Sequence, residues 1–129
     1  MLSARKKEMN VFLLFDSVLV RKSVKEILSA RREIQLVGEA RNALKALHDI
    51  RRLQPDAIIM HSQDGDRFGI DILRGIRTAS PESTVMMLKT RMYSHRGRCD
   101  AERAGPDIFL KSFAEWKNIP EILTETATD

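Results

Sequence analysis

The 129-residue sequence has little cysteine, few aromatic residues and no long apolar run. Its single cysteine, Cys99, excludes an intramolecular disulfide and is typical of proteins from a reducing compartment. No apolar run approaches the roughly 20 residues that span a bilayer. The charged start, residues 1–8, is not followed by the apolar stretch of a secretory signal. We therefore expect a cytoplasmic protein that does not bind a membrane.

Composition favours one folded domain with an aliphatic core. Hydrophobic residues make up 43% of the chain and charged residues 31%, whereas aromatic residues reach only 5%. The length suits a single domain. A net charge of +4 permits an acidic partner, but no motif or aromatic interleaving points to nucleic acid, so we do not expect nucleic acid as a partner.

Short apolar runs mark five predicted strands. The runs within 11–15 and 56–61 are continuous rather than alternating, which is typical of strands covered on both faces. The remaining predicted strands are 34–37, which ends at Gly38, 85–88 and 107–110.

Helical spacing of apolar residues follows these strands. Ser17 is predicted to cap a helix that runs to about Ala30, with Leu19 among its inward residues. A second helix is predicted at 43–53, with Leu44 facing inward and Pro55 ending the segment. Further helices are predicted around 70–76, in irregular form within 91–104, and from about residue 118 onward.

This alternation predicts a single doubly wound α/β domain with a five-stranded parallel sheet, a flavodoxin-like (βα)5 arrangement. We expect the domain to occupy residues 10–127 and a flexible tail to occupy residues 1–9. In such sheets the functional site lies at the carboxyl ends of the strands. The candidate residues there are Phe15, Asp16, His61, Lys89, Thr90 and Lys111.

One carboxylate, one imidazole and two ammonium groups are predicted to meet at this edge of the sheet. We expect Asp16 to pair with Lys89, Lys111 or both, and therefore to stay ionised. Each lysine would oppose a divalent cation by about 1 kcal/mol or more, so we expect no magnesium. Zinc is not expected either, because the histidines and Cys99 lack ligand spacing. No cofactor is predicted, and a small anion is the more plausible guest.

Several segments together resemble the receiver domain of bacterial response regulators. Residues 51–61 resemble the stretch that leads to the family's phosphoacceptor, and residues 70–77 resemble the helix after it. Residues 104–113 resemble the family's fifth strand with its lysine, and residues 37–40 resemble its second-strand end. The resemblance covers nearly the whole chain, from about residue 10 to residue 123, and implies the same fold.

The resemblance also implies a degenerate phosphorylation pocket. The phosphoacceptor aspartate falls on His61, and the family's two adjacent acidic residues fall on Phe15 and Asp16. An acyl phosphate needs a carboxylate nucleophile, so the phosphoacceptor is lost. A metal ion at this place would also lose two of its three acidic supports.

Two lysines occupy the other functional positions of the family. The hydroxyl residue after the fourth strand falls on Lys89, although Thr90 is adjacent to it, and the lysine after the fifth strand is retained as Lys111. Lys89 places a cation where a phosphoryl group would lie. It could therefore reproduce part of the charge balance permanently, which is a hypothesis.

The family binds partners through a face that includes its fourth helix, fifth strand and last helix. The residues assigned to this partner face are Arg91, Arg96, Arg98, Ile108, Phe109 and Trp116. A solvated surface is the alternative for the arginines. Trp116 is either a core residue or an anchor of a dimer face. The family's aromatic switch residue falls on Ile108, or on Phe109 if the strand is displaced by one residue.

These observations predict an atypical receiver domain of two-component signal transduction that is independent of phosphorylation and is not an enzyme. We expect it to bind a protein partner, such as a histidine kinase or a downstream regulator, and a homodimer is a further option. One alternative is a phosphorelay receiver that uses a non-standard residue such as His61. Another is a sensor of a small anion or nucleotide that uses Lys89 and Lys111.

Overall fold

The computed structural model describes residues 8–61, 66–88, 106–110 and 113–127. Five parallel strands form one sheet in the order β2-β1-β3-β4-β5. The strands are β1 (Met9–Phe15), β2 (Ile34–Ala40), β3 (Ala57–His61), β4 (Thr84–Leu88) and β5 (Ile108–Leu110). The helices are α1 (Val18–Leu28), α2 (Ala43–Leu53), α3 (Asp66–Ala79), α5 (Phe113–Trp116) and α6 (Ile119–Ala127).

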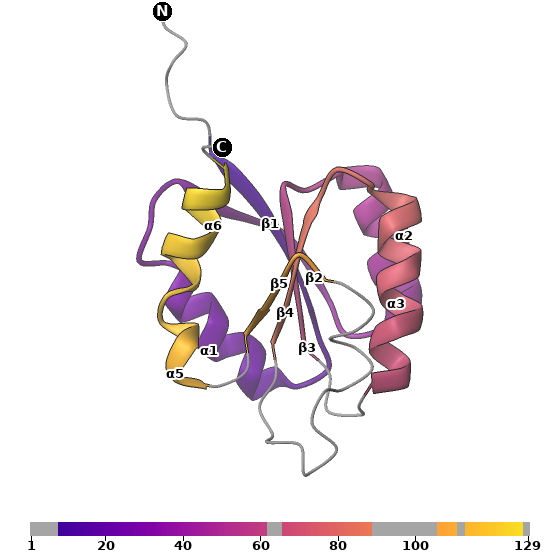
Figure 1. Cartoon of the computed structure of the whole chain (residues 1–129), viewed down its shortest axis with the longest axis horizontal. Coiled ribbons are helices and arrows are strands. Elements are labelled where there is room, and N and C mark those ends of the chain that lie inside the picture. The colour runs from indigo at the N-terminus through magenta and orange to yellow at the C-terminus, as the bar shows by residue number, and fades with distance from the viewer. Residues whose placement is uncertain (1–7, 62–65, 89–105, 111–112, 128–129) are drawn as a thin grey trace, which may run out of the picture.

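The helices cover both faces of the sheet. Helices α1, α5 and α6 lie on one face, whereas α2 and α3 lie on the other (Figure 1). The predicted doubly wound α/β fold with a five-stranded parallel sheet is therefore confirmed. The predicted helix within 91–104 lies outside the described residues. Among the helices that the structure describes, none is long and apolar enough to cross a membrane.

The strands are continuously apolar because helices cover both faces of the sheet. The buried strand residues on the side of α2 and α3 are Phe12, Leu14, Ala40, Ile58, Met60, Val85 and Met87. Those on the side of α1 and α6 are Met9, Val11, Leu13, Phe15, Ala57, Ile59, Met86, Leu88 and Leu110. Successive side chains of a strand point to opposite faces, so a strand between two helical layers needs apolar residues at every position.

The first strand begins two residues earlier than the sequence predicted. Met9 opens β1 rather than ending a tail, because its backbone N–H donates to the Glu33 carbonyl at 2.6 Å and its side chain is buried. At the next residue, the Asn10 N–H donates to the Asp56 carboxylate at 2.8 Å. The Asp56 N–H in turn donates to the Asn10 carbonyl, so this end of the central strands is tied at two points.

Strand β2 is also longer than predicted, since it continues through Gly38 to Ala40. The register between β1 and β2 shifts between Val11 and Phe12, which places Phe12 opposite Gly38. A Cβ atom on Gly38 would lie 2.8 Å from Cε2 of Phe12. The glycine therefore makes room for the buried ring instead of ending the strand.

Polar side chains cap the amino ends of α1 and α2. The Ser17 hydroxyl oxygen accepts a hydrogen bond from the Val20 N–H at 3.2 Å at the start of α1, which confirms the predicted cap. Asn42 caps α2 in the same way, and its side chain accepts from the Lys45 N–H at 3.0 Å. Helix α2 ends where Gln54 adopts a left-handed conformation with φ of 47°.

Two leucines that were predicted to face the core are exposed. Leu19 is 76% exposed and Leu44 is 83% exposed. In α1 the buried residues are Val24 and Leu28, and each helix position turns the side chain by about 100°. Leu19 is therefore off the apolar stripe, and the prediction was wrong because an apolar residue beside the stripe looks the same in sequence.

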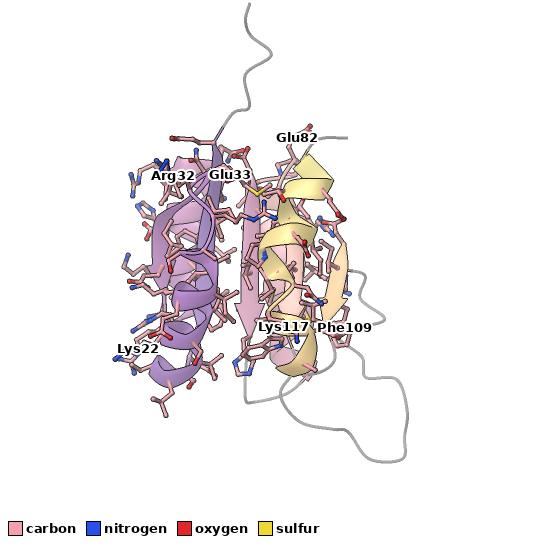
Figure 2. All side chains as sticks on the ribbon, turned by 90° about the vertical axis from the view of Figure 1, so that its left-hand side faces the viewer. Lys22, Arg32, Glu33, Glu82, Phe109 and Lys117 are labelled. Carbon is pink, nitrogen blue, oxygen red and sulfur yellow. The ribbon has the colours of Figure 1, made fainter. Side chains whose placement is uncertain are left out.

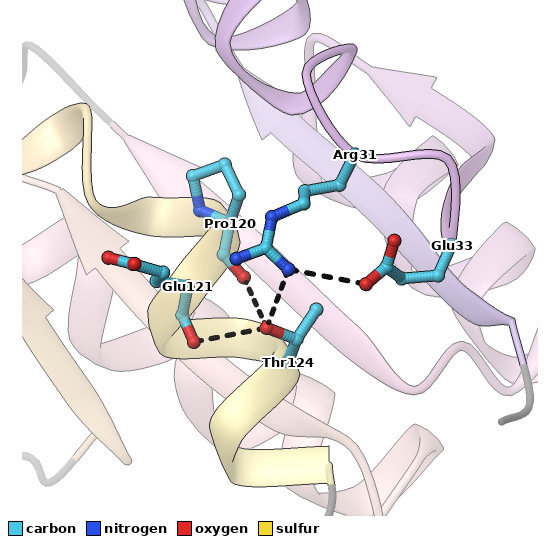
Figure 3. Close-up of polar contacts among 5 residues, drawn as sticks. All are labelled: Arg31, Glu33, Pro120, Glu121 and Thr124. Carbon is cyan, nitrogen blue, oxygen red and sulfur yellow. Dashed lines mark hydrogen bonds and ion pairs between the residues drawn. The ribbon is translucent and has the colours of Figure 1, made fainter.

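The last helix begins at Ile119, as predicted. Figure 3 shows how it is attached to the segment between α1 and β2. The Arg31 guanidinium donates to the Glu33 carboxylate at 3.2 Å and to the Thr124 hydroxyl oxygen at 3.4 Å. The Thr124 hydroxyl in turn donates to the Pro120 carbonyl, one helical turn earlier, at 2.9 Å.

Candidate functional site

The candidate site lies where the strand order reverses. The chain proceeds from β1 outward to β2 and then returns past β1 to β3, so the carboxyl ends of β1 and β3 diverge at this point. Phe15 ends β1, pairs in register with His61 at the end of β3, and is followed by Asp16. The structure thus brings three of the six predicted pocket residues together.

The other three pocket residues lie outside the described part of the chain. Lys89 and Thr90 follow β4 in sequence, and Lys111 follows β5. The predicted ion pair between Asp16 and these lysines therefore stays a prediction. The same holds for the arginines of the partner face, Arg91, Arg96 and Arg98.

Three aromatic rings from three elements meet at this site. The His61 ring stacks on the Phe15 ring, with centroids 5.9 Å apart and 27° between the planes. The Trp116 ring meets His61 edge-on, with centroids 6.2 Å apart and an angle of 77°. All three side chains are buried, and His61 is only 3% exposed. We call Phe15, His61 and Trp116 the aromatic cluster.

The aromatic cluster decides between the two options for Trp116. This side chain is buried among residues of the α1 and α6 side, with Ile119 and Leu123 as members of the same cluster. Its assignment to the partner face was therefore wrong, because the short helix α5 turns the indole toward the sheet. Ile108 and Phe109 of the predicted partner face are half-buried and pack on opposite sides of the sheet.

Burial sets the protonation state of His61. Removal from water lowers the pKa of His61 below its ordinary value of 6.5, and the nearby negative charge of Asp16 opposes this change to a smaller extent. The imidazole is therefore neutral at pH 7. A neutral imidazole between two rings carries no charge to attract a phosphoryl group or to repel a cation.

The described residues offer little to a metal ion. No group of three or more His, Cys, Asp or Glu side chains among them is arranged to hold one. Asp16 is half-buried at the site, but Phe15 and His61 contribute a hydrocarbon ring and a buried imidazole in place of oxygen ligands. The prediction that no metal binds also rests on Lys89 and Lys111, which lie outside the described residues.

Solved structures with a similar fold include receiver domains. The receiver domain of the response regulator NarL from Mycobacterium tuberculosis is 21% identical, with a TM-score of 0.77 over 95% of this chain and 98% of that one. The response regulator domain of Thermotoga maritima CheB is 23% identical, with a TM-score of 0.70 over 95% and 96% of the two chains. The chain has the receiver fold. The resemblance seen in the sequence is confirmed at this level.

Curated relatives include larger proteins. A protein-glutamate methylesterase/protein-glutamine glutaminase 2 of Pseudomonas fluorescens (strain Pf-5) is 35% identical over 112 residues, which are 86% of this chain and 30% of that protein. A protein with the same two activities in its name from Carboxydothermus hydrogenoformans is 26% identical over 89% of this chain and 34% of its own length. The chain thus spans about a third or less of these relatives. No protein-family model matches it.

Two features of this chain were not predicted from its sequence. The aromatic cluster was not predicted, although the ring at position 15 and the single tryptophan of the sequence were visible signals. The cations beside the edge strand β2 were not singled out either. Helical periodicity alone does not show which exposed side chains gather beside the same strand.

Proposed function

We propose that this chain is a receiver domain of two-component signalling that works without accepting a phosphoryl group and acts by binding a protein partner in the cytoplasm. The observation that carries the proposal is His61, which is neutral and buried between Phe15 and Trp116 at the end of β3. By the resemblance, this is the position of the family's phosphoacceptor. A histidine kinase or a downstream regulator is the kind of partner we propose.

The chemistry of the site supports this proposal in two ways. Formation of an acyl phosphate requires a carboxylate oxygen as nucleophile, and an imidazole at position 61 cannot form that species. A phosphoryl group also brings two negative charges, which a site lined by the Phe15 and Trp116 rings cannot solvate. Among the described residues, the aromatic cluster therefore favours an uncharged, packed state at the ends of β1 and β3.

Phosphotransfer through His61 is the weaker alternative. A neutral imidazole is a nucleophile, but this ring is 3% exposed and contacts aromatic rings on two sides. A donor enzyme would have to unpack the aromatic cluster to reach it. Binding of an anion or nucleotide by Lys89 and Lys111 depends on residues outside the described part and stays a prediction.

We further propose that the chain is not an enzyme. The names of its relatives describe an esterase and a glutaminase, but the chain matches only 30% and 34% of the lengths of the two relatives described above. Within the described residues, the carboxyl ends of β1 and β3 present no nucleophile paired with a base. A direct assay of methyl ester hydrolysis with the purified chain tests this part of the proposal, and turnover would contradict it.

The central experiment is incubation with acetyl phosphate and magnesium, followed by intact mass measurement. We expect no mass gain in the unmodified protein. Beryllofluoride with magnesium should leave the fluorescence of Trp116 unchanged, because this indole lies 6.2 Å from the His61 ring and would respond to a group bound there. His48→Gln is the matched control, since His48 is exposed on α2.

The result that would overturn the proposal is equally specific. A phosphoryl group gained by the unmodified protein and by His48→Gln, but lost in His61→Gln, would show that His61 accepts phosphate. A quench or shift of Trp116 fluorescence by beryllofluoride would show that the pocket still binds a phosphoryl mimic.

A further inference from the structure

Charge is unevenly distributed along the described chain. Residues 18–54 contain nine Lys and Arg but only four Asp and Glu, an excess of five positive charges. All other described residues together contain four Lys and Arg and ten Asp and Glu. The segment from α1 to α2 is thus basic, although the rest of the described protein is acidic.

The basic side chains of α1 lie beside the edge strand β2. Arg21 and Lys25 both reach the Glu39 carboxylate on β2, at 3.5 Å and 3.3 Å. Figure 2 shows Lys22 and Arg32 along the margin of the molecule formed by α1, whereas Lys117 lies in the turn between α5 and α6, away from that margin. Lys22 and Arg32 are exposed.

Helix α2 presents further cations toward the same edge. Leu47 packs against Gly75 of α3, so this side of α2 faces α3. Lys45, Asp49 and Arg52 lie between about 140° and 200° around the helix from Leu47, at about 100° per residue. They therefore point away from α3, toward β2. Lys45 and Arg52 contact Asp49 at 2.6 Å and 3.6 Å.

These residues form what we call the β2-edge basic face. Its members are Arg21, Lys22, Lys25, Arg32, Arg41, Lys45 and Arg52. Two carboxylates, Glu39 and Asp49, are each shared between two of these cations. Lys22, Arg32 and Arg41 form no ion pair with any other residue that the structure describes. The face thus carries more positive charge than its own acids neutralise.

Protection of an edge strand does not explain so many charges. Edge strands often carry a charged side chain that prevents pairing with a second sheet. That role needs a charge on the strand itself, and on β2 the charged residue is Glu39. Here the cations stand on both flanking helices and directly before and after the strand.

We infer that the β2-edge basic face binds an acidic segment of a partner protein. Charge complementarity of this kind raises the rate of association and selects partners. A protein fits better than nucleic acid, because Glu39 and Asp49 interrupt the path that a phosphate backbone would follow. In addition, the face offers no aromatic side chain to a base. The inference does not depend on the state of the aromatic cluster.

The test uses a fluorescein-labelled 20-residue peptide of alternating glutamate and serine, with fluorescence anisotropy as readout. We expect saturable binding that weakens as the salt concentration rises. Arg32→Glu combined with Arg41→Glu should weaken binding by at least about tenfold at low salt. The matched control is Arg74→Glu with Lys117→Glu, two exposed residues away from this face, which should change the affinity by less than about threefold.

Amide chemical shifts on addition of the peptide provide a second readout, and we expect the changes to fall within residues 18–54. Equal loss of binding in both double variants would reduce the effect to net charge and overturn the inference. Tighter binding of a 20-base-pair DNA duplex than of the peptide would assign the face to nucleic acid instead. Self-association of the unmodified protein that Arg32→Glu with Arg41→Glu abolishes would assign it to a second copy. Each of these outcomes contradicts an acidic protein partner.

Discussion

The imidazole of His61 stacks on the ring of Phe15, with centroids 5.9 Å apart and 27° between the planes. Two strand ends that carry acidic residues in the family resembled here are therefore joined by ring packing. Both side chains are buried, and the indole of Trp116 closes the third side. The consequences of this packing can be measured.

Replacing His61 by aspartate should destabilise the protein rather than restore a phosphorylation site. A carboxylate at this position would be buried between the Phe15 and Trp116 rings and close to the Asp16 charge, which disfavours its ionised form. We expect a loss of about 3 kcal/mol in the free energy of unfolding, measured by urea denaturation at pH 7. Acetyl phosphate should still give no mass gain.

His48→Asp is the matched control for this substitution. His48 is exposed on α2, so the change should stay within about 0.5 kcal/mol. If His61→Asp is as stable as the unmodified protein, the site contains more water or positive charge than its aromatic lining indicates.

The lowered pKa of His61 predicts how stability depends on pH. The unfolded chain binds a proton near the ordinary value of 6.5, whereas the folded protein resists protonation at lower pH. The unfolded state therefore holds more protons in this window, and the free energy of unfolding should fall as the pH is lowered below about 6.5. The loss ends once the pH is below the folded pKa.

Denaturation series between pH 7.5 and pH 5 would measure this slope, over a range of pH that contains the titration of an ordinary histidine. His61→Gln should remove most of the slope, and His48→Gln should leave it intact. An unchanged slope in His61→Gln would assign the pH dependence to another group. Asp49, whose pKa is lowered by its hydrogen bond with Lys45, affects stability only at more acidic pH.

A methyl group added at Gly38 or Gly75 would meet a neighbouring side chain at a similar distance, but we expect the two alanine substitutions to change stability differently. On Gly38 the new methyl would lie 2.8 Å from the buried Phe12 ring, which cannot move without disturbing the core. We expect Gly38→Ala to cost about 1–3 kcal/mol, as overpacking does. On Gly75 it would meet the end of the Leu47 side chain at 2.9 Å, and alanine favours a helix by about 1 kcal/mol, so the net change should be small.

Thermal denaturation of the two variants checks this contrast. Phe12→Leu should partly rescue Gly38→Ala, because the smaller side chain vacates the space that the methyl needs. Equal effects of the two glycine substitutions would show that the β1–β2 register adapts more easily than the fit of Phe12 to Gly38 indicates.

The fold could be predicted from the sequence because helix caps and continuous apolar runs depend on residues that are close together in the chain. Ser17 caps α1, and the apolar run that ends at Phe15 is buried on both faces as its composition required. The predictions that failed concern features that neighbouring residues in the sequence do not determine. Leu19 and Leu44 share the composition of inward residues but not their direction, and Gly38 was taken for a strand end because its contact with Phe12 depends on strand pairing.

Only part of the candidate site could be predicted from the sequence. Strand ends could be found from the sequence, so Phe15, Asp16 and His61 were expected to meet. The contact of Trp116 with His61 could not be found in this way, because it depends on the direction in which the short helix α5 leaves β5. Long-range packing of this kind has no periodic signal in the sequence.

The attachment of α6 also bears on how the chain folds during synthesis. Ile119 and Leu123 complete the apolar layer beneath α1, and Arg31 reaches Thr124 across 93 positions of sequence. A nascent chain can pair β1 with β2 early, but that layer stays open to water until α6 has been synthesised. A stall or frameshift before α6 would therefore expose an unfinished core to chaperones and proteases.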